Sequence, residues 1–265
     1  MNYQMFISFI MVVSLTELLK KNFVIYIYIR MLEIHETSFE FHKNTFVVKY
    51  DPTDMTGLAA INEIVTDNVY VLDKFVNLEG KVLIDIGANI GIATIIMAKL
   101  NPKSIVYAFE PFNKSYELLL ENIKANNLSN VIPFNLAVSN KTNKKLNLSI
   151  FGLWSGANST NSDPNLFGQF YGINKENQII ECISFDKIIT DNNINEIYLL
   201  KIDCEGAEYD IIYDSDKFKN GVVKNIVGEF HDIKYMKNEK RSTKLIEYCK
   251  KYVEGVFKIE VLEIL

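Results

Sequence analysis

Cysteine is scarce in this 265-residue chain, and its few copies exclude several kinds of site. Cys182, Cys204 and Cys249 are odd in number, widely spaced, and contain no Cys-x-x-Cys pair. Because such a set cannot build a disulfide framework, we expect a reducing, cytoplasmic location. With only three histidines in addition, a zinc site made from clustered cysteine and histidine is excluded as well.

Arginine is rare too, with Arg30 and Arg241 as its only copies, and acidic residues outnumber basic ones by 33 to 28. The formal net charge is -5, and no basic stripe alternates with aromatic residues. A nucleic-acid groove needs such a stripe, so we expect no nucleic-acid partner. The composition, 48% hydrophobic and 12% aromatic, is instead typical of a globular protein with a sizeable core.

Long hydrophobic runs are missing from the amino-terminal region. Residues 5–15 and 23–29 are apolar, but polar and charged residues separate them, and neither run reaches the roughly 18 residues of a membrane span. No basic residue precedes the first run, as a secretory signal would require. Three interpretations stay open: a weak membrane anchor through residues 5–29, an additional packing helix, or a translation start set too early, with Met31 opening the ordinary sequence.

Apolar strands and helical patterns alternate from about residue 45, which predicts an α/β fold with a mostly parallel sheet and helices on both faces. We expect an apolar extension over residues 1–44 and one domain over 45–265. The polar stretch 152–177 predicts a long loop that shapes a substrate pocket, between strands at 146–150 and 178–184. Helical spacing covers 57–75, 92–100 and 113–126, and the other expected strands are 45–50, 81–87, 104–109, 131–135, 198–203, 225–230 and 259–265.

An acid and two glycines follow one of the predicted strands, in the order Asp85, Gly87 and Gly91. Ligands of open parallel sheets bind at the carboxyl ends of the strands. The glycines let the backbone turn and let a ligand approach, and the helix that begins near Ile92 directs free N–H groups at it. The Asp85 carboxylate repels phosphates but suits a cationic amine, and the loop lacks the third glycine of the dinucleotide fingerprint G-x-G-x-x-G.

A second acid, Glu110, ends the next strand, where a carboxylate can accept both hydroxyls of a ribose. An amine-binding acid followed by a ribose-binding acid describes S-adenosylmethionine as the ligand. Asn135 and the main chain near Ala137 end the third strand, where the adenine edge would lie. This last signal is weak, because asparagine often marks a turn.

A group of titratable residues ends two later strands: Lys201, Asp203 and Glu205 on one, and Glu229 and His231 on the other. If these strands are neighbours, the side chains converge beside the methyl group of the cofactor. His231 is then the natural base for an acceptor hydroxyl near neutral pH. A divalent metal held by Asp203, Glu205 and His231 is the alternative.

Some charged residues near this group have simpler, structural interpretations. Glu208 is expected in the first turn of a helix, where an acid favours the helix dipole. Lys201 is expected to pair with Asp203. His35 and His42 lie outside any cluster and receive no role.

These segments together resemble the FkbM family of S-adenosylmethionine-dependent methyltransferases, from about residue 63 to 232. The Asp-Ile-Gly-Ala-Asn loop is common to many methyltransferases, whereas its combination with Lys-Ile-Asp-x-Glu-Gly-Ala-Glu is much more specific. We expect the carboxyl end to be short of the antiparallel last strand that such folds usually carry. The segments that carry the resemblance are Asp85-Ile86-Gly87-Ala88-Asn89-Ile90-Gly91, Ala108-Phe109-Glu110-Pro111, Asn135-Leu136-Ala137-Val138, Ser184-Phe185-Asp186, Lys201-Ile202-Asp203-Cys204-Glu205-Gly206-Ala207-Glu208 and Glu229-Phe230-His231.

The resemblance implies a class I methyltransferase (Rossmann-like) fold and O-methylation of a hydroxyl on a sugar, glycan or natural product. A nicotinamide-dependent oxidoreductase and a non-catalytic binding module with the same fold are the competing interpretations. We predict Asp203, Glu205 and His231 as catalytic residues. The predicted residues for binding S-adenosylmethionine are Asp85, Gly87, Ala88, Asn89, Gly91, Glu110, Pro111, Asn135 and Ala137.

Overall fold

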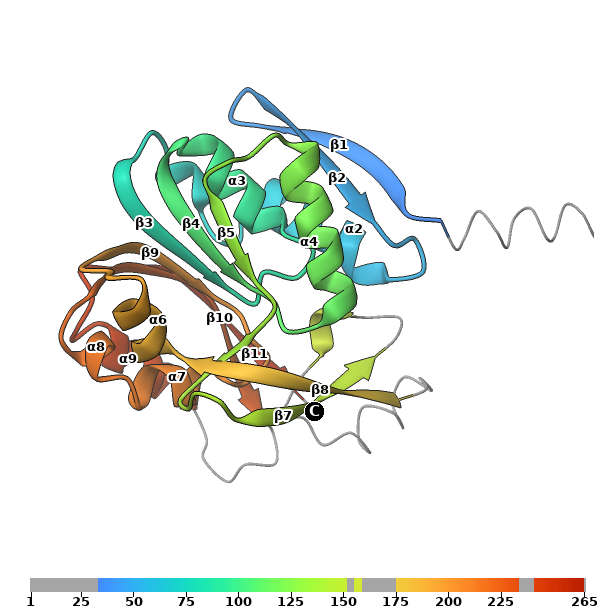
Figure 1. Ribbon diagram of the computed structural model, residues 1–265. Helices are drawn as coiled ribbons and strands as arrows, with labels where there is room; N and C mark the ends of the chain where they lie inside the picture. Colours follow the sequence, from blue (N-terminus) through green and yellow to red (C-terminus); the bar gives the residue numbers. More distant parts are fainter. Residues whose placement is uncertain (1–32, 152–154, 159–174, 234–240, 265) are drawn as a thin grey trace, which may run out of the picture.

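A six-stranded sheet in the order β11-β10-β9-β3-β4-β5 forms the centre of the computed structural model, which describes residues 33–151, 155–158, 175–233 and 241–264 (Figure 1). All of its neighbouring strands pair in parallel, so the predicted α/β class is confirmed. The strands are β3 (Glu79–Ile86), β4 (Lys103–Phe109), β5 (Val131–Phe134), β9 (Ile197–Ile202), β10 (Val223–Ile233) and β11 (Gly255–Ile264).

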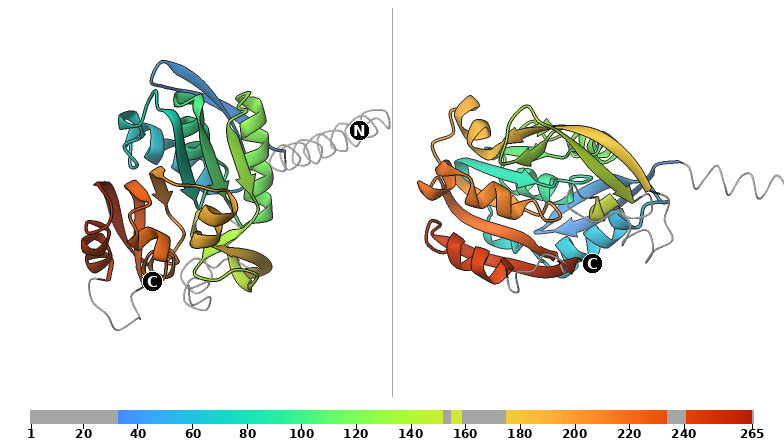
Figure 2. Two further views of the ribbon diagram at one scale, coloured as in Figure 1. Left: turned by 60° about the vertical axis from the view of Figure 1, so that its left-hand side comes forward. Right: turned by 90° about the horizontal axis from the view of Figure 1, so that it is seen from below.

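Helices cover both faces of this sheet, because its central strands are apolar on both sides. Leu83 and Leu199 face one buried cluster, and the next residues, Ile84 and Leu200, face the other. Helices α3 (Ile92–Leu100) and α4 (Asn113–Ala125) lie on the first face (Figure 2). The second face is covered by α6 (Phe185–Asp191), α7 (Glu208–Tyr213), α8 (Asp216–Lys219) and α9 (Arg241–Cys249).

A β-hairpin that the sequence analysis did not anticipate in full precedes the sheet. Its strands, β1 (His35–Phe41) and β2 (Asn44–Tyr50), are antiparallel, and the predicted boundary between residues 44 and 45 falls within β2, after its first residue. Asn122 of α4 and Asn126, which caps the end of this helix, anchor β2. Asn122 bonds both backbone groups of Lys49, at 2.6 and 3.0 Å, and Asn126 bonds both backbone groups of Val47, at 3.0 and 2.7 Å.

The single helix predicted over residues 57–75 is wrong in its extent. The segment instead contains α2 (Met55–Ile61), a π-helical turn at Asn62–Thr66 and a short 3-10 helix at Leu72–Lys74. Asn68 and Val71 adopt left-handed backbone angles, with φ of 48° and 45°, which a continuous helix cannot contain. Because the helix is interrupted, Tyr70, which lies between these two residues, is buried in the core and only 3% exposed.

A small three-stranded sheet, in the order β6-β8-β7, lies beside the carboxyl ends of the central strands (Figure 1). Its members are β6 (Ala137–Ser139), β7 (Lys145–Phe151) and β8 (Lys175–Ser184), so the strands predicted at 146–150 and 178–184 are confirmed. Most of the loop predicted over 152–177 lies outside the described residues; Ser155–Ala157 within it form a 3-10 turn.

The last strand, β11, closes one edge of the central sheet in parallel with β10. Within the residues that the structure describes, no strand of this sheet runs antiparallel to its neighbour. Across the same residues, no helix has both the length and the apolar character needed to cross a membrane. The apolar runs within residues 5–29 lie outside the described part of the chain.

Candidate functional site

A cavity of about 520 Å³ opens where the central strands end and the small sheet begins. Its volume is within the range of about 300–1,000 Å³ that is usual for small-molecule sites. The ends of β3, β4, β9 and β10 form one side, and α2 and the small sheet form the other. Among the predicted cofactor residues, those that line it are Gly87, Ala88, Asn89, Glu110, Pro111 and Ala137, whereas Asp85, Gly91 and Asn135 do not.

The loop after β3 depends on glycine for a reason that the sequence did not reveal. Gly87 has a φ of 79°, and a Cβ atom there would lie 1.7 Å from the carbonyl oxygen of Asp203. The ends of β3 and β9 therefore touch through backbone atoms, and the Asp203 amide donates to the Ile86 carbonyl at 3.1 Å. Next in the loop, the side-chain oxygen of Asn89 is buried at the cavity without a hydrogen-bond partner.

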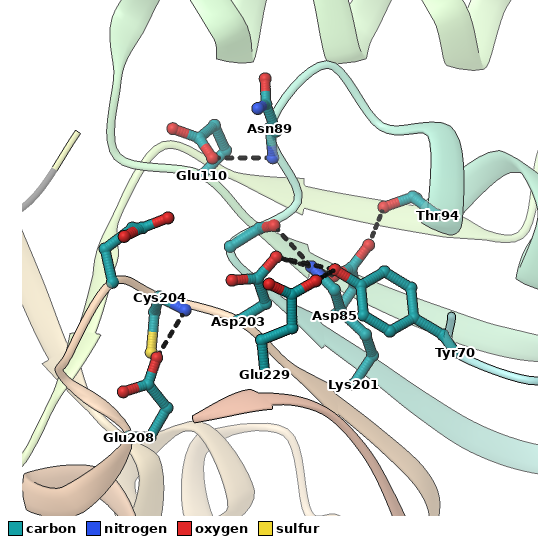
Figure 3. A network of polar contacts seen from close by, with 12 residues as sticks. Tyr70, Asp85, Asn89, Thr94, Glu110, Lys201, Asp203, Cys204, Glu208 and Glu229 are labelled. Carbon is teal, nitrogen blue, oxygen red and sulfur yellow. Dashed lines mark hydrogen bonds and ion pairs between the residues drawn. The ribbon is translucent and has the colours of Figure 1, made fainter. Parts of the chain in front are cut away.

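Glu110 presents a buried carboxylate to the cavity from the end of β4 (Figure 3). Its two oxygens accept the backbone N–H groups of Asn89 and Phe112, both at 2.8 Å. Burial raises the pKa of Glu110 to about 7, although these two hydrogen bonds favour the charged form. Asn135 lies behind it and donates to the carbonyls of Glu110 and Pro111, at 3.0 and 3.2 Å, so it braces the turn.

Asp85 is completely buried and has partners within the protein. Its carboxylate accepts the Thr94 hydroxyl at 2.6 Å and pairs with the Lys201 ammonium at 3.2 Å. Lys201 also donates to the Gly87 carbonyl at 2.8 Å and lies 3.7 Å from Asp203. Burial opposes the charge on Lys201, but Asp85 and Asp203 raise its pKa on balance. Asp85 therefore acts on the cavity only through Lys201. The Lys201 ammonium links the glycine loop, through the Gly87 carbonyl, to Asp203 at the end of β9.

The acids of β9 and β10 converge as the sequence predicted, because these two strands are neighbours. Asp203, Glu205 and Glu229 all line the cavity. The Tyr70 hydroxyl lies 2.8 Å from Asp203 Oδ2 and 3.0 Å from Glu229 Oε1 (Figure 3). Burial raises the pKa of Glu205 and of Glu229, and in both cases the charge of Asp203 adds to the effect. The site therefore holds an excess of carboxylates beside the glycine loop.

Tyr70 is a site residue that the sequence analysis missed. Its phenol is almost entirely buried, and the Lys201 ammonium lies 5.1 Å from the centre of its ring. Burial and the charges of Asp203 and Glu229 raise its pKa, so it remains a hydrogen-bond donor at neutral pH. A tyrosine inside an otherwise apolar helical pattern was the available signal.

His231 lies behind the acids and does not line the cavity. Its Nδ1 is 2.9 Å from Glu208 Oε1, whereas its Nε2 is 3.8 Å from Asp203 and 3.7 Å from Glu205 and has no hydrogen-bond partner. Burial opposes its charge, but the bond to Glu208 and the charge of Glu205 raise its pKa to about 10. Because His231 does not reach the cavity, its position does not favour it as the base for an acceptor that binds there.

Glu208 is the anchor of the turn that carries these groups. It lies in the first turn of α7, as expected, and its carboxylate accepts the backbone N–H group of Cys204 at 3.0 Å (Figure 3). The same carboxylate accepts the backbone N–H group of Gly206 at 3.2 Å. Glu205 between them has a left-handed φ of 53°. Residues held in such angles are common at functional sites, where surrounding contacts compensate the strain.

The Ser184-Phe185-Asp186 segment is placed away from the cavity. Asp186 accepts the Ser215 hydroxyl and the backbone N–H groups of Asp216 and Lys217, so it holds the start of α8. We therefore assign Asp186 a structural role.

Comparison with known proteins gives one family and several distant relatives. Residues 85–253, more than half of the chain, match the model of the methyltransferase FkbM domain. Methyltransferase 1 of Beauveria bassiana is 27% identical over 184 residues, which cover 65% of this chain and 72% of that protein. A tRNA(Phe) (4-demethylwyosine(37)-C(7)) aminocarboxypropyltransferase of Methanocaldococcus jannaschii is 46% identical over 59 residues, 22% of this chain and 24% of that one.

Among solved structures, M. jannaschii TYW2 in complex with AdoMet is 24% identical, with a TM-score of 0.30. The similarity covers 45% of this chain and 65% of that one. The family match spans the glycine loop, Glu110, the acids of β9 and β10 and His231, whereas Tyr70 precedes it.

Proposed function

The chain belongs to the FkbM family of S-adenosylmethionine-dependent methyltransferases, and we propose that it transfers the methyl group to a hydroxyl on a sugar, glycan or natural product. The predicted class I fold is confirmed by the sheet order and the family. The nicotinamide oxidoreductase interpretation is wrong, because the family uses a different cofactor. The free thiols Cys182, Cys204 and Cys249 support a reducing, cytoplasmic location for this activity.

The residues of the cavity fit S-adenosylmethionine, which supplies the methyl group as an electrophilic sulfonium. Glu110 would hold the ribose, because each of its oxygens keeps a lone pair after accepting a backbone N–H group. The unpartnered Asn89 oxygen offers a further acceptor on the same wall. Ala88 and Ala137 add small side chains that leave room for a flat base. We assign Asp85 the part of fixing Lys201 and, through it, the carbonyl of Gly87.

The observation that carries the proposal is the set of three carboxylates, Asp203, Glu205 and Glu229, on the cavity wall next to the glycine loop. An acceptor hydroxyl donates its hydrogen to one of them and presents an oxygen lone pair to the methyl carbon. One of these carboxylates would take the hydroxyl proton and leave the acceptor oxygen as the nucleophile for the methyl group. Burial makes Glu205 and Glu229 stronger bases when ionised, and the nearby negative charge also suits a cationic sulfonium.

His231 supports this set from behind. Its ring lies between the Glu208 carboxylate and those of Asp203 and Glu205, at 2.9, 3.8 and 3.7 Å. We therefore propose that Asp203 and Glu205 touch the acceptor and that His231 acts by positioning them.

The test is a screen for methylated products. The purified protein is incubated with extracts of hydroxylated metabolites and S-adenosylmethionine deuterated in its methyl group, and products are followed by mass spectrometry. The proposal predicts a CD3 ether on oxygen, formed in equal amount to S-adenosylhomocysteine. Labelled methyl groups found only on nitrogen or carbon would contradict it.

A further inference from the structure

One buried atom of the acidic cluster has no partner in the protein. His231 is 1% exposed, and its Nε2 has no hydrogen-bond partner. It faces Asp203 Oδ1 and Glu205 Oε2 at 3.8 and 3.7 Å, which is too long for a hydrogen bond to either. The other ring nitrogen is engaged by Glu208 at 2.9 Å. A buried polar atom without a partner is costly, so something beyond these side chains is expected to satisfy it.

Three atoms that can bind a metal ion lie close together. One atom each from Asp203, Glu205 and His231 lie within 4.8 Å of one another. Atoms bound to one ion at about 2.0–2.2 Å lie roughly 3–4.4 Å apart, and the two distances to Nε2 fall within that range. Glu208 adds the carboxylate that commonly orients a metal-binding histidine through its second nitrogen.

We propose that Asp203, Glu205 and His231 bind one divalent transition-metal ion such as Mn²⁺. A mixed set of one imidazole and two carboxylates suits such an ion. Asp203 and Glu205 line the cavity whereas His231 does not, so an ion held by these three residues would be accessible from the cavity. The site rests on the proposed function in one respect: with the ion bound, Asp203 and Glu205 would contact the acceptor oxygen through it, and Glu229, which lines the cavity outside this set of ligands, would take the proton.

The experiment titrates Mn²⁺ into the metal-free 265-residue chain and follows the free-ion signal by electron paramagnetic resonance. Wild type is expected to bind one Mn²⁺ per chain. Asp203→Asn and Glu205→Gln should each weaken binding at least tenfold. Glu63→Gln is the matched control, because Glu63 lines the same cavity outside the cluster, and binding should change less than threefold. Circular dichroism confirms that each variant is folded, and the two cavity-facing variants avoid cutting the buried His231–Glu208 contact.

Failure of the metal site and failure of the methyltransferase proposal give different results. No Mn²⁺ binding at millimolar concentration, or binding that is unchanged in Glu205→Gln, overturns the metal site. If chelated protein then still forms the CD3 ether, the proposed function stands without it. Mn²⁺ bound at this cluster supports the site even if every acceptor is methylated on nitrogen or carbon.

Discussion

Replacing Glu110 by glutamine should weaken cofactor binding and remove its dependence on pH. The Glu110 carboxylate accepts two backbone N–H groups at 2.8 Å and still offers a lone pair on each oxygen. A glutamine side chain at this position has only one oxygen as acceptor. Its NH2 group faces a backbone N–H group and cannot accept a hydrogen bond from it. Loss of one hydrogen bond to a charged group costs about 1.5–3 kcal/mol, which is roughly a tenfold to hundredfold rise in Kd.

The pH dependence follows from the raised pKa of Glu110, which burial brings to about 7. Ribose hydroxyls donate to the ionised form, so wild-type affinity should be constant above this pH and fall about tenfold per unit below it. The stability of the cofactor-free protein should change in the opposite direction. Because the folded pKa exceeds the unfolded value of 4.5, the contribution of Glu110 to stability is present at low pH and is lost as pH rises through about 7.

Calorimetric titration with S-adenosylmethionine between about pH 5.5 and 8.5 measures the affinity, and thermal melts of the cofactor-free protein measure the stability. Glu117→Gln is the matched control, because this acid lies on the exposed side of the neighbouring α4. The reasoning is refuted if Glu110→Gln binds as tightly as wild type. It is also refuted if wild-type affinity is the same at pH 6 and pH 8.

Three further changes test the framework of the site. Gly87→Ala should destabilise the cofactor-free protein by roughly 2–4 kcal/mol in urea unfolding, because its Cβ would meet the Asp203 carbonyl at 1.7 Å; an unchanged midpoint would contradict the backbone contact. Lys201→Met should cost about 3–5 kcal/mol in the same assay, because it leaves Asp85 buried without its cation, and a loss below 1 kcal/mol would show that the pair is dispensable. Deletion of residues 1–30 should leave a folded protein that binds S-adenosylmethionine in calorimetry, because β1 begins at His35; an insoluble or non-binding product would show that the apolar runs belong to the core.

The strands and the ends of the sheet were predictable from sequence because local patterns specify them. Apolar runs that end in glycine or acid located β3 and β9, and the alternation with helices gave the parallel sheet. The helix predicted over 57–75 was less predictable, because the spacing of apolar residues does not show the left-handed angles of Asn68 and Val71. These angles depend on packing against the rest of the core.

The sequence predicted many of the residues that form the candidate site, but not which of them contact one another. The sequence placed Asp85 and Glu110 at the ends of successive strands. Only the structure shows that the Asp85 carboxylate accepts a hydrogen bond from Thr94 and pairs with Lys201. The depth of His231 also depends on the sheet, since β10 continues past the end of β9 and Glu208 reaches the ring from α7. Such contacts join residues far apart in the sequence, and no local pattern encodes them.

The most direct test of the account measures methyl transfer and cofactor affinity separately in Asp203→Asn. The single-turnover rate of methyl transfer from S-adenosylmethionine to the hydroxylated acceptor should fall by a factor of about 10²–10⁴. The reason is that the variant lacks the Asp203 carboxylate, which contacts the acceptor. Cofactor Kd should stay within about threefold of wild type, and the exposed control Asp216→Asn should leave both quantities unchanged. A variant that transfers methyl groups at the wild-type rate, or one that loses affinity for the cofactor as much as it loses rate, would contradict the acceptor role of the β9 acids.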